Sequence, residues 1–257
     1  MEYQHELQRL ITDIRLNCLP SVSIDCVIFG FHSGQLKVLL LRWKGTGDWC
    51  LPGGRIRHEE SLDEAAHRSL RQRTGLSEIF LQQFHTFGDV TRYKHFSVQE
   101  TLKKLGLPDD VGQAIISRDV SVGYYALVEF ANVTPTPGPF TDECRWWSID
   151  QIPPLLFDHN DMISLALKTL RRQLSYQPIG YNLLPDKFTM PDLQQLYETI
   201  LGQPLDRRNF QKRMLGYGIL ERLDERKLGG AHKAPYLYQF NQANYMAALD
   251  AERLYVD

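Results

Sequence analysis

One segment, residues 49–76, constrains the fold of this chain more than any other. It reads as a glycine turn at Gly54 followed by a capped amphipathic helix. Ser61 and Glu64 form a capping box, so the helix should begin directly after Ser61. Apolar side chains then recur at helical spacing and predict a buried stripe of Leu62, Ala65, Ala66 and Leu70.

The frame of this segment resembles the Nudix box, G-x5-E-x7-R-E-U-x-E-E-x-G-U, in which U is an aliphatic residue. The positions that fit are Gly54, Glu60, Arg68, Leu70, Gly75 and Leu76. The three glutamates that follow the arginine of the box are replaced by Ser69, Gln72 and Arg73. A pyrophosphate hydrolase needs carboxylates there, because Mg²⁺ is a hard cation that prefers anionic oxygen ligands. The sequence therefore predicts a ligand-binding Nudix domain with no catalytic residues, no metal and no cofactor.

Two alternatives compete with this interpretation. A working Nudix pyrophosphohydrolase, acting on ADP-ribose or a nucleotide sugar, would have to hold Mg²⁺ through the remaining acids Glu59, Glu60 and Glu64. The same acids are favoured at the start of a helix by capping and by the helix dipole, without any metal. A pure protein-interaction module is the other alternative, and it leaves the basic C-terminal region described below unexplained.

Length and charge bound the remaining possibilities. At 257 residues the chain is long enough for two modest domains. The net charge of −2 is not that of a general nucleic-acid binder, so any DNA affinity must come from a local patch. The four cysteines stand singly, without a C-x-x-C pair, which favours reduced thiols over a zinc site. No signal peptide and no membrane-spanning run is recognisable, so we expect a cytoplasmic protein with no membrane partner.

Strand-like and helix-like runs alternate through the first two thirds of the chain and predict an α+β fold. Strands are expected at residues 22–31, 36–43, 79–88 and 120–130, with a short final strand at 145–149. Helices are expected at residues 4–16 and 159–174. Residues 94–116 resemble an insertion, interpreted as a surface excursion or as a lid over a pocket.

A change in character at residues 175–188 predicts a linker, because this stretch is rich in turn-forming residues such as Pro178, Gly180 and Pro185. The prediction gives a first domain at residues 1–174, containing the N-terminal helix and the 94–116 insertion, and a second domain at 189–257.

Two helices open the second domain. Thr189 is the expected N-cap of the first helix and Gly202 its end. Asp206 is the expected N-cap of a second, basic helix over residues 207–214, in which Phe210 and Met214 face inward. A strand at 219–220, a polar loop at 221–234 and a strand at 236–240 follow. This order is typical of a winged helix-turn-helix.

Charge supports DNA binding by this region. Residues 203–233 carry eight basic and four acidic residues, a net of +4. The basic helix also contains Asn and Gln, which are suited to reading base edges in the major groove. The predicted DNA-binding residues are Arg207, Arg208, Asn209, Gln211, Lys212, Arg213, Arg222, Arg226, Lys227, His232 and Lys233.

Together the two parts resemble the Nudix-related transcriptional regulator family, over nearly the whole chain. Besides the box, the resemblance rests on residues 21–30, 121–127, 156–159, 178–180, 183–185, 188–189 and 205–210. It implies a Nudix α/β/α sandwich with a mixed sheet, followed by a winged helix-turn-helix. It also implies a homodimeric repressor that its ligand releases from palindromic double-stranded operator DNA. One branch of the family senses ADP-ribose; another, closer to this chain, has a broken box and responds to L-arabinose.

The effector site is the least defined part of the prediction. Nudix folds bind ligands between the box and the neighbouring strands, which makes Arg42, Trp43, Arg57, Asp89 and Arg92 the candidates. Arginines suit phosphates, whereas Asp and Trp suit sugar hydroxyls and sugar faces. A surface charge or a core aromatic is the competing interpretation for each of them alone.

Overall fold

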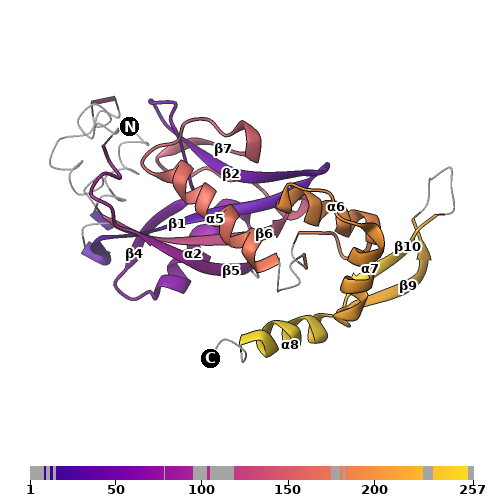
Figure 1. The fold of residues 1–257 in the computed structure, drawn as a ribbon. Coiled ribbons are helices and arrows are strands. Elements are labelled where there is room, and N and C mark those ends of the chain that lie inside the picture. Colours follow the sequence, from indigo (N-terminus) through magenta and orange to yellow (C-terminus); the bar gives the residue numbers. More distant parts are fainter. Residues whose placement is uncertain are drawn as a thin grey trace. The chain divides into compact units, whose positions relative to one another are not determined.

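The computed structural model describes residues 9, 12–13, 16–77, 79–94, 103–104, 119–174, 180–181, 183–227 and 234–253 (Figure 1). The chain divides into two compact units, residues 1–30 with 37–166, and residues 31–36 with 167–257. Most of the predicted 4–16 helix and of the predicted 94–116 insertion lies outside the described residues, as do linker residues 175–179, His232 and Lys233. The predicted domain boundaries remain a prediction.

The first unit is built on a seven-stranded sheet with the order β3-β2-β1-β6-β5, in which β4 also pairs with β1 and β7 with β2. The strands are β1 (Cys18–His32), β2 (Gln35–Trp43), β3 (Trp49–Cys50), β4 (Gly53–Arg57), β5 (Phe80–Phe87), β6 (Val120–Glu129) and β7 (Thr141–Ser148). Ser33 and Gly34, both with positive φ, form the two-residue turn between β1 and β2. The predicted strand at 145–149 is longer than expected and begins at Thr141.

The core of this unit follows from the two-residue period of its central strands. Ile24, Cys26 and Ile28 of β1 pack in one cluster with Tyr124 and Ala126 of β6. The alternate residues of both strands are buried as well, which explains why these strands read as nearly continuous apolar runs.

Helix α2 (Leu62–Thr74) covers this cluster. Ser61 and Glu64 make both hydrogen bonds of the predicted capping box, and Gly75 ends the helix in the left-handed conformation. Ala65 and Ala66 are buried as predicted, but Leu62 is 36% exposed, so its place in the buried stripe was wrong. In the first turn the capping geometry, rather than the apolar period, decides where a side chain lies.

Helix α5 (His159–Leu174) has its predicted bounds. Met162, Ile163 and Ala166 are buried and belong to the first unit, whereas residues 167–174 belong to the second. Two short 3-10 helices, η1 (Phe130–Asn132) and η2 (Ile149–Gln151), flank β7. Among the described residues, no helix is long and apolar enough to cross a membrane.

Within its described residues, the second unit contains the end of α5, three further helices and a three-stranded sheet with the order β8-β10-β9. Its elements are β8 (Phe188–Thr189), α6 (Met190–Leu201), α7 (Arg207–Gly216), β9 (Leu220–Arg226), β10 (Tyr236–Phe240) and α8 (Gln242–Arg253). Thr189 and Asp206 cap α6 and α7 as predicted. The predicted loop at 221–234 was wrong in its first part, because residues 221–226 pair with β10 and extend strand β9.

Aromatic and aliphatic side chains hold α7 in place. Phe210 packs edge to face on Tyr197 of α6, with ring centroids 5.2 Å apart, and both Phe210 and Met214 are buried. Burial of these two residues turns the opposite face of α7 toward solvent, as the sequence predicted.

Candidate functional site

A cavity of about 630 Å³ lies in the first unit, beside strand β4 and the C-terminal half of α2. The chain contributes aromatic, acidic and basic side chains to its wall. The charged and aromatic residues among them include Asp25, Trp43, Lys44, Arg55, Arg57, Arg68, Arg73, Arg92, Tyr93, Asp119 and His159. A cavity of this size with convergent polar groups suits a small-molecule ligand.

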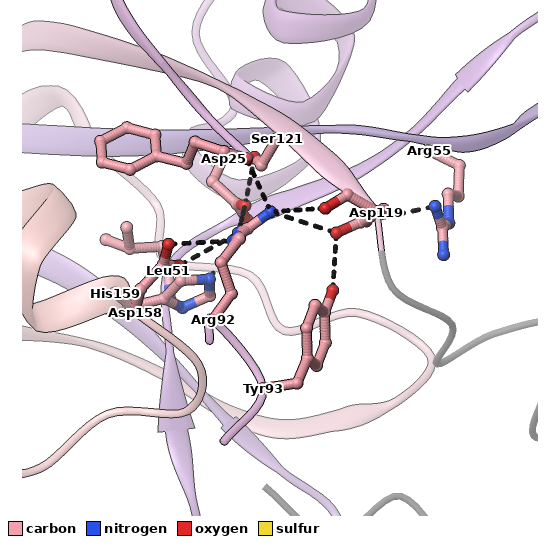
Figure 2. A network of polar contacts seen from close by, with 10 residues as sticks. Asp25, Leu51, Arg55, Arg92, Tyr93, Asp119, Ser121, Asp158 and His159 are labelled. Atoms are coloured by element: carbon pink, nitrogen blue, oxygen red, sulfur yellow. Dashed lines mark hydrogen bonds and ion pairs between the residues drawn. The ribbon is translucent and has the colours of Figure 1, made fainter. Parts of the chain in front are cut away.

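The most buried cation of the cavity wall is Arg92, whose side chain is 2% exposed (Figure 2). Its Nε and Nη2 donate to the two carboxylate oxygens of Asp158, at 2.9 and 3.1 Å, in a bidentate pair. Its Nη1 donates to Asp119 at 3.2 Å, and Asp25 lies 3.8 Å from Nη2. Burial opposes the charge, but these three carboxylates outweigh it and raise the pKa of Arg92.

Asp119 is the second centre of this network, as Figure 2 shows. It accepts a hydrogen bond of 2.6 Å from the hydroxyl of Tyr93 and forms an ion pair of 3.1 Å with Arg55 of β4. Burial, and next the hydrogen bond to Asp119, raise the pKa of Tyr93, so its hydroxyl stays a donor. Segments far apart in the chain are therefore tied together at one wall of the cavity.

His159, the first residue of α5, takes part in the same wall. Its Nδ1 accepts a hydrogen bond of 3.0 Å from the backbone N–H of Leu51, and its Nε2 lies 3.6 Å from Asp25. The hydroxyl of Ser121 donates to the other oxygen of Asp25 at 2.6 Å. His159 thus has a packing and hydrogen-bonding role.

Two of the acids that the box retains, Glu60 and Glu64, are occupied by partners within the protein. Arg68 donates to both oxygens of Glu60, at 2.6 and 2.9 Å, and to the carbonyl of Arg55 at 2.8 Å. The Arg68 hydrogen bond, more than any other contact, lowers the pKa of Glu60. The carboxylate of Glu64 is held by the backbone N–H of Ser61. In the described part of the chain, no cluster of three or more His, Cys, Asp or Glu residues has the arrangement of a metal site.

Three of the five predicted ligand-binding residues line the cavity: Trp43, Arg57 and Arg92. Arg42 does not line it; its guanidinium pairs with Asp142 at 2.8 Å and with Glu143 at 2.9 Å. Asp89 does not line it either, and accepts hydrogen bonds from Thr91 in a tight turn. Their role in ligand binding remains a prediction.

Helix α7 presents a basic surface in the second unit. Arg207, Arg208, Asn209 and Lys212 are exposed, and Gln211 is half-buried. Arg213 is used internally, because its Nη2 donates to the carbonyl of Leu174 at 3.0 Å. The outward face of the first two turns therefore carries two arginines, an asparagine and a lysine.

The strand pair β9–β10 holds the remaining basic residues. The guanidiniums of Arg222 and Arg226 stack on the Tyr236 ring, at 4.7 and 3.9 Å from its centroid. Arg226 also donates to the carbonyl of Ala234 at 2.8 Å. Lys227 forms an ion pair of 3.3 Å with Asp192 of α6. These contacts give the hairpin a defined shape next to α7.

Comparison with known proteins also divides the chain into two parts. The NUDIX domain model matches residues 19–166, and the model of the NrtR DNA-binding winged helix domain matches residues 180–240. The chain is 29% identical over 233 residues to a protein of Acinetobacter baylyi named ADPR responsive transcriptional repressor NtrR, a match that covers 88% of this chain and 84% of that protein.

Solved structures give the same picture. The crystal structure of Shewanella oneidensis NrtR has a TM-score of 0.70 and 26% identity, covering 88% of this chain and 96% of that one. The structure of the same protein complexed with a 27mer DNA has a TM-score of 0.67 and 25% identity, covering 88% and 95% of the two chains.

Proposed function

The chain belongs to the Nudix family and joins its Nudix domain to a winged helix of the NrtR type, and we propose on this basis that it is a ligand-responsive transcriptional repressor. The observation that carries the proposal is α7, which follows a capped helix and a tight turn and presents exposed Arg207, Arg208, Asn209 and Lys212. Arginine and asparagine make bidentate contacts to guanine and adenine, and lysine suits phosphates. A DNA partner also implies a cytoplasmic location.

We further propose that the protein acts as a homodimer on palindromic double-stranded operator DNA. Two copies of α7 would read half-sites about one helical turn apart, or a multiple of that spacing. Symmetry of the site then follows from symmetry of the dimer.

The Nudix domain is proposed to bind its ligand without hydrolysing it. Hydrolases of the family hold Mg²⁺ through the glutamates of the box, and those positions are Ser69, Gln72 and Arg73 here. Glu60 is already neutralised by Arg68 at 2.6 Å. These residues do not fit a magnesium site, so no catalytic step is assigned to them. A pyrophosphohydrolase acting on ADP-ribose or a nucleotide sugar remains the competing hypothesis.

Two effector classes are consistent with the family resemblance. The Acinetobacter relative is named for its response to ADPR, an anionic diphosphate. The resemblance to the arabinose-responsive branch implies a neutral sugar instead. In either case the ligand acts on DNA binding only through unequal affinity for two arrangements of the dimer, and DNA must lower the ligand affinity by the same factor.

A mobility-shift titration tests the regulator hypothesis. The probe is duplex DNA from upstream of the protein's own coding sequence, titrated at low and high salt with and without ADP-ribose or L-arabinose. We expect specific binding that one of these ligands weakens, and no metal-dependent hydrolysis of ADP-ribose in a parallel assay. Absence of DNA binding at low salt contradicts the regulator hypothesis, and turnover that Glu60→Gln abolishes supports the hydrolase.

A further inference from the structure

Arg73 occupies an unusual position in the cavity wall. It lies in the last turn of α2, at the point where the Nudix box would place a metal-binding glutamate. Its guanidinium packs against the loop that carries Gly138, so closely that a Cβ added to that glycine would lie 2.5 Å from Nη2. Its Nε is buried and has no hydrogen-bond partner within the described residues. A buried polar atom without a partner is uncommon in proteins and calls for an explanation, of which a bound anion is one.

The other cations of the cavity wall have partners inside the protein. Four arginines pair with carboxylates: Arg55 with Asp119, Arg57 with Asp13, Arg68 with Glu60, and Arg92 with Asp25, Asp119 and Asp158. The ammonium group of Lys44 donates to the carbonyl of Pro139 at 2.9 Å. Within the described part of the chain, Arg73 has no carboxylate partner.

The thiols beside Arg73 do not supply the missing negative charge. Cys50 and Cys144 are the two groups whose ionised forms would raise the pKa of Arg73. Burial raises the pKa of Cys50 to about 12 and that of Cys144 to about 11, so both thiols are neutral at physiological pH. Burial lowers the pKa of Arg73, but a guanidinium stays charged in this range. Arg73 is therefore a partly buried cation, with a buried Nε, whose counter-charge is not provided by the described residues.

We propose that Arg73 replaces the divalent metal of the Nudix box, so that the cavity binds a phosphorylated, anionic ligand directly and without a metal. The proposal rests on the proposed function, since it names the ligand class of the regulator's cavity. An anion removes the cost of an unpaired buried charge, and a guanidinium matches phosphate oxygens with two parallel hydrogen bonds. A divalent cation at the same point would be repelled by Arg73. A neutral sugar would leave the guanidinium without a counter-charge.

Calorimetric titration of the full-length protein tests this assignment. The probes are ADP-ribose, inorganic pyrophosphate and L-arabinose, each in EDTA and again in Mg²⁺. We expect the wild type to bind both anions with an affinity that EDTA leaves unchanged. Arg73→Gln should weaken both by roughly 10- to 100-fold, the effect of losing a charge-assisted hydrogen-bond pair. Arg73→Lys should weaken them less, because lysine keeps the charge but not the fork geometry.

Arg71→Gln is the matched control. Arg71 is exposed, lies in the same turn of α2 and does not line the cavity, so anion affinity should stay at the wild-type value. The inference is overturned if neither anion binds, if binding requires Mg²⁺, if Arg73→Gln binds as tightly as the wild type, or if only L-arabinose binds.

Thermal unfolding separates ligand binding from a merely structural role. Arg73→Gln should unfold without ligand at the same temperature as the wild type or higher, because an unpaired buried charge has been removed, yet lose the stabilisation that ADP-ribose gives. A lower melting temperature with an intact ligand-induced shift contradicts the proposal. Binding of upstream duplex DNA by each ligand-free variant is measured in parallel. Absence of DNA binding by the ligand-free wild type refutes the regulator function alone, whereas intact DNA binding with Arg73-independent anion affinity refutes this inference alone.

Discussion

Replacing Arg92 by methionine should destabilise the first unit severely. The guanidinium is the only described cation that contacts Asp25, Asp119 and Asp158 together, and its side chain is 2% exposed. Methionine preserves much of the volume but leaves buried carboxylates without their counter-charge. Removing one partner of a buried ion pair typically costs about 3–5 kcal/mol of the free energy of unfolding. For a unit of this size, that loss lowers the melting temperature by about 6–20 °C.

Tryptophan fluorescence reports on this unit selectively, because Trp43, Trp49, Trp146 and Trp147, the four tryptophans of the chain, all belong to it. Urea titration of the wild type and of Arg92→Met, followed at the tryptophan emission, gives the two free energies of unfolding. The slope of the free energy of unfolding against urea concentration must be equal in both proteins. Only then does the difference between their two free energies report a change in stability.

Arg42→Met is the matched control. Arg42 also pairs with two carboxylates, but its side chain is 38% exposed and lies at the surface. Exposed pairs contribute little to the free energy of unfolding, because water and salt screen them. A loss in Arg92→Met no larger than that in Arg42→Met would refute the view that burial makes the Arg92 network stabilising.

Three further predictions concern other elements. Gly53→Ala should lower the free energy of unfolding by about 1–3 kcal/mol, because the added Cβ collides with the carboxylate of Asp25 in β1. Gly54→Ala, where the added Cβ meets open space, should leave the free energy of unfolding nearly unchanged in the same urea titration. Glu60→Gln should destabilise the protein at neutral pH but not in acid, because Arg68 lowers the pKa of Glu60 in the folded state. The stability that the Glu60 carboxylate contributes is present above its unfolded pKa of about 4.3 and is lost as the pH falls through its folded pKa. Asp206→Ala removes the N-cap of α7 and should cost about 1 kcal/mol of helix stability, measured as weaker binding to upstream duplex DNA, and an unchanged affinity contradicts it.

Helices α2, α6 and α7 could be predicted closely because their ends carry local signals, whereas α8 (Gln242–Arg253) was not predicted. The capping boxes at Ser61 and Thr189 and the C-terminal glycines Gly75 and Gly202 each satisfy backbone groups within a few residues of themselves. Short strands carry no such signal. Strand β4 has no alternating apolar pattern, and it forms because β1 supplies its hydrogen-bond partners from a distant part of the chain.

The candidate site was harder to predict, since the type of a residue does not show in which direction its side chain points. Arg42 and Trp43 were both plausible ligand-binding residues, but neighbours on a strand point to opposite faces. Leu41 and Trp43 of β2 line the cavity, and Arg42 between them turns to Asp142 and Glu143 instead. Arg92 could be named from its charge, whereas its carboxylate partners could not, because three different parts of the fold bring them together.

The same reasoning narrows the proposed DNA-binding surface. The sequence offers a run of basic residues without showing which of them are already used inside the protein. Arg213 is bound to the end of α5, Arg222 and Arg226 are stacked on Tyr236, and Lys227 is paired with Asp192. These residues shape and anchor the winged helix, so a contact with DNA would have to compete with existing partners. The basic side chains on the first two turns of α7 face no such competition within the described residues, and they stand where the helix dipole also favours an anion. We therefore propose that the first two turns of α7 recognise the DNA base sequence. We expect the β9–β10 hairpin to contribute to DNA binding mainly through its shape and its position against the phosphate backbone.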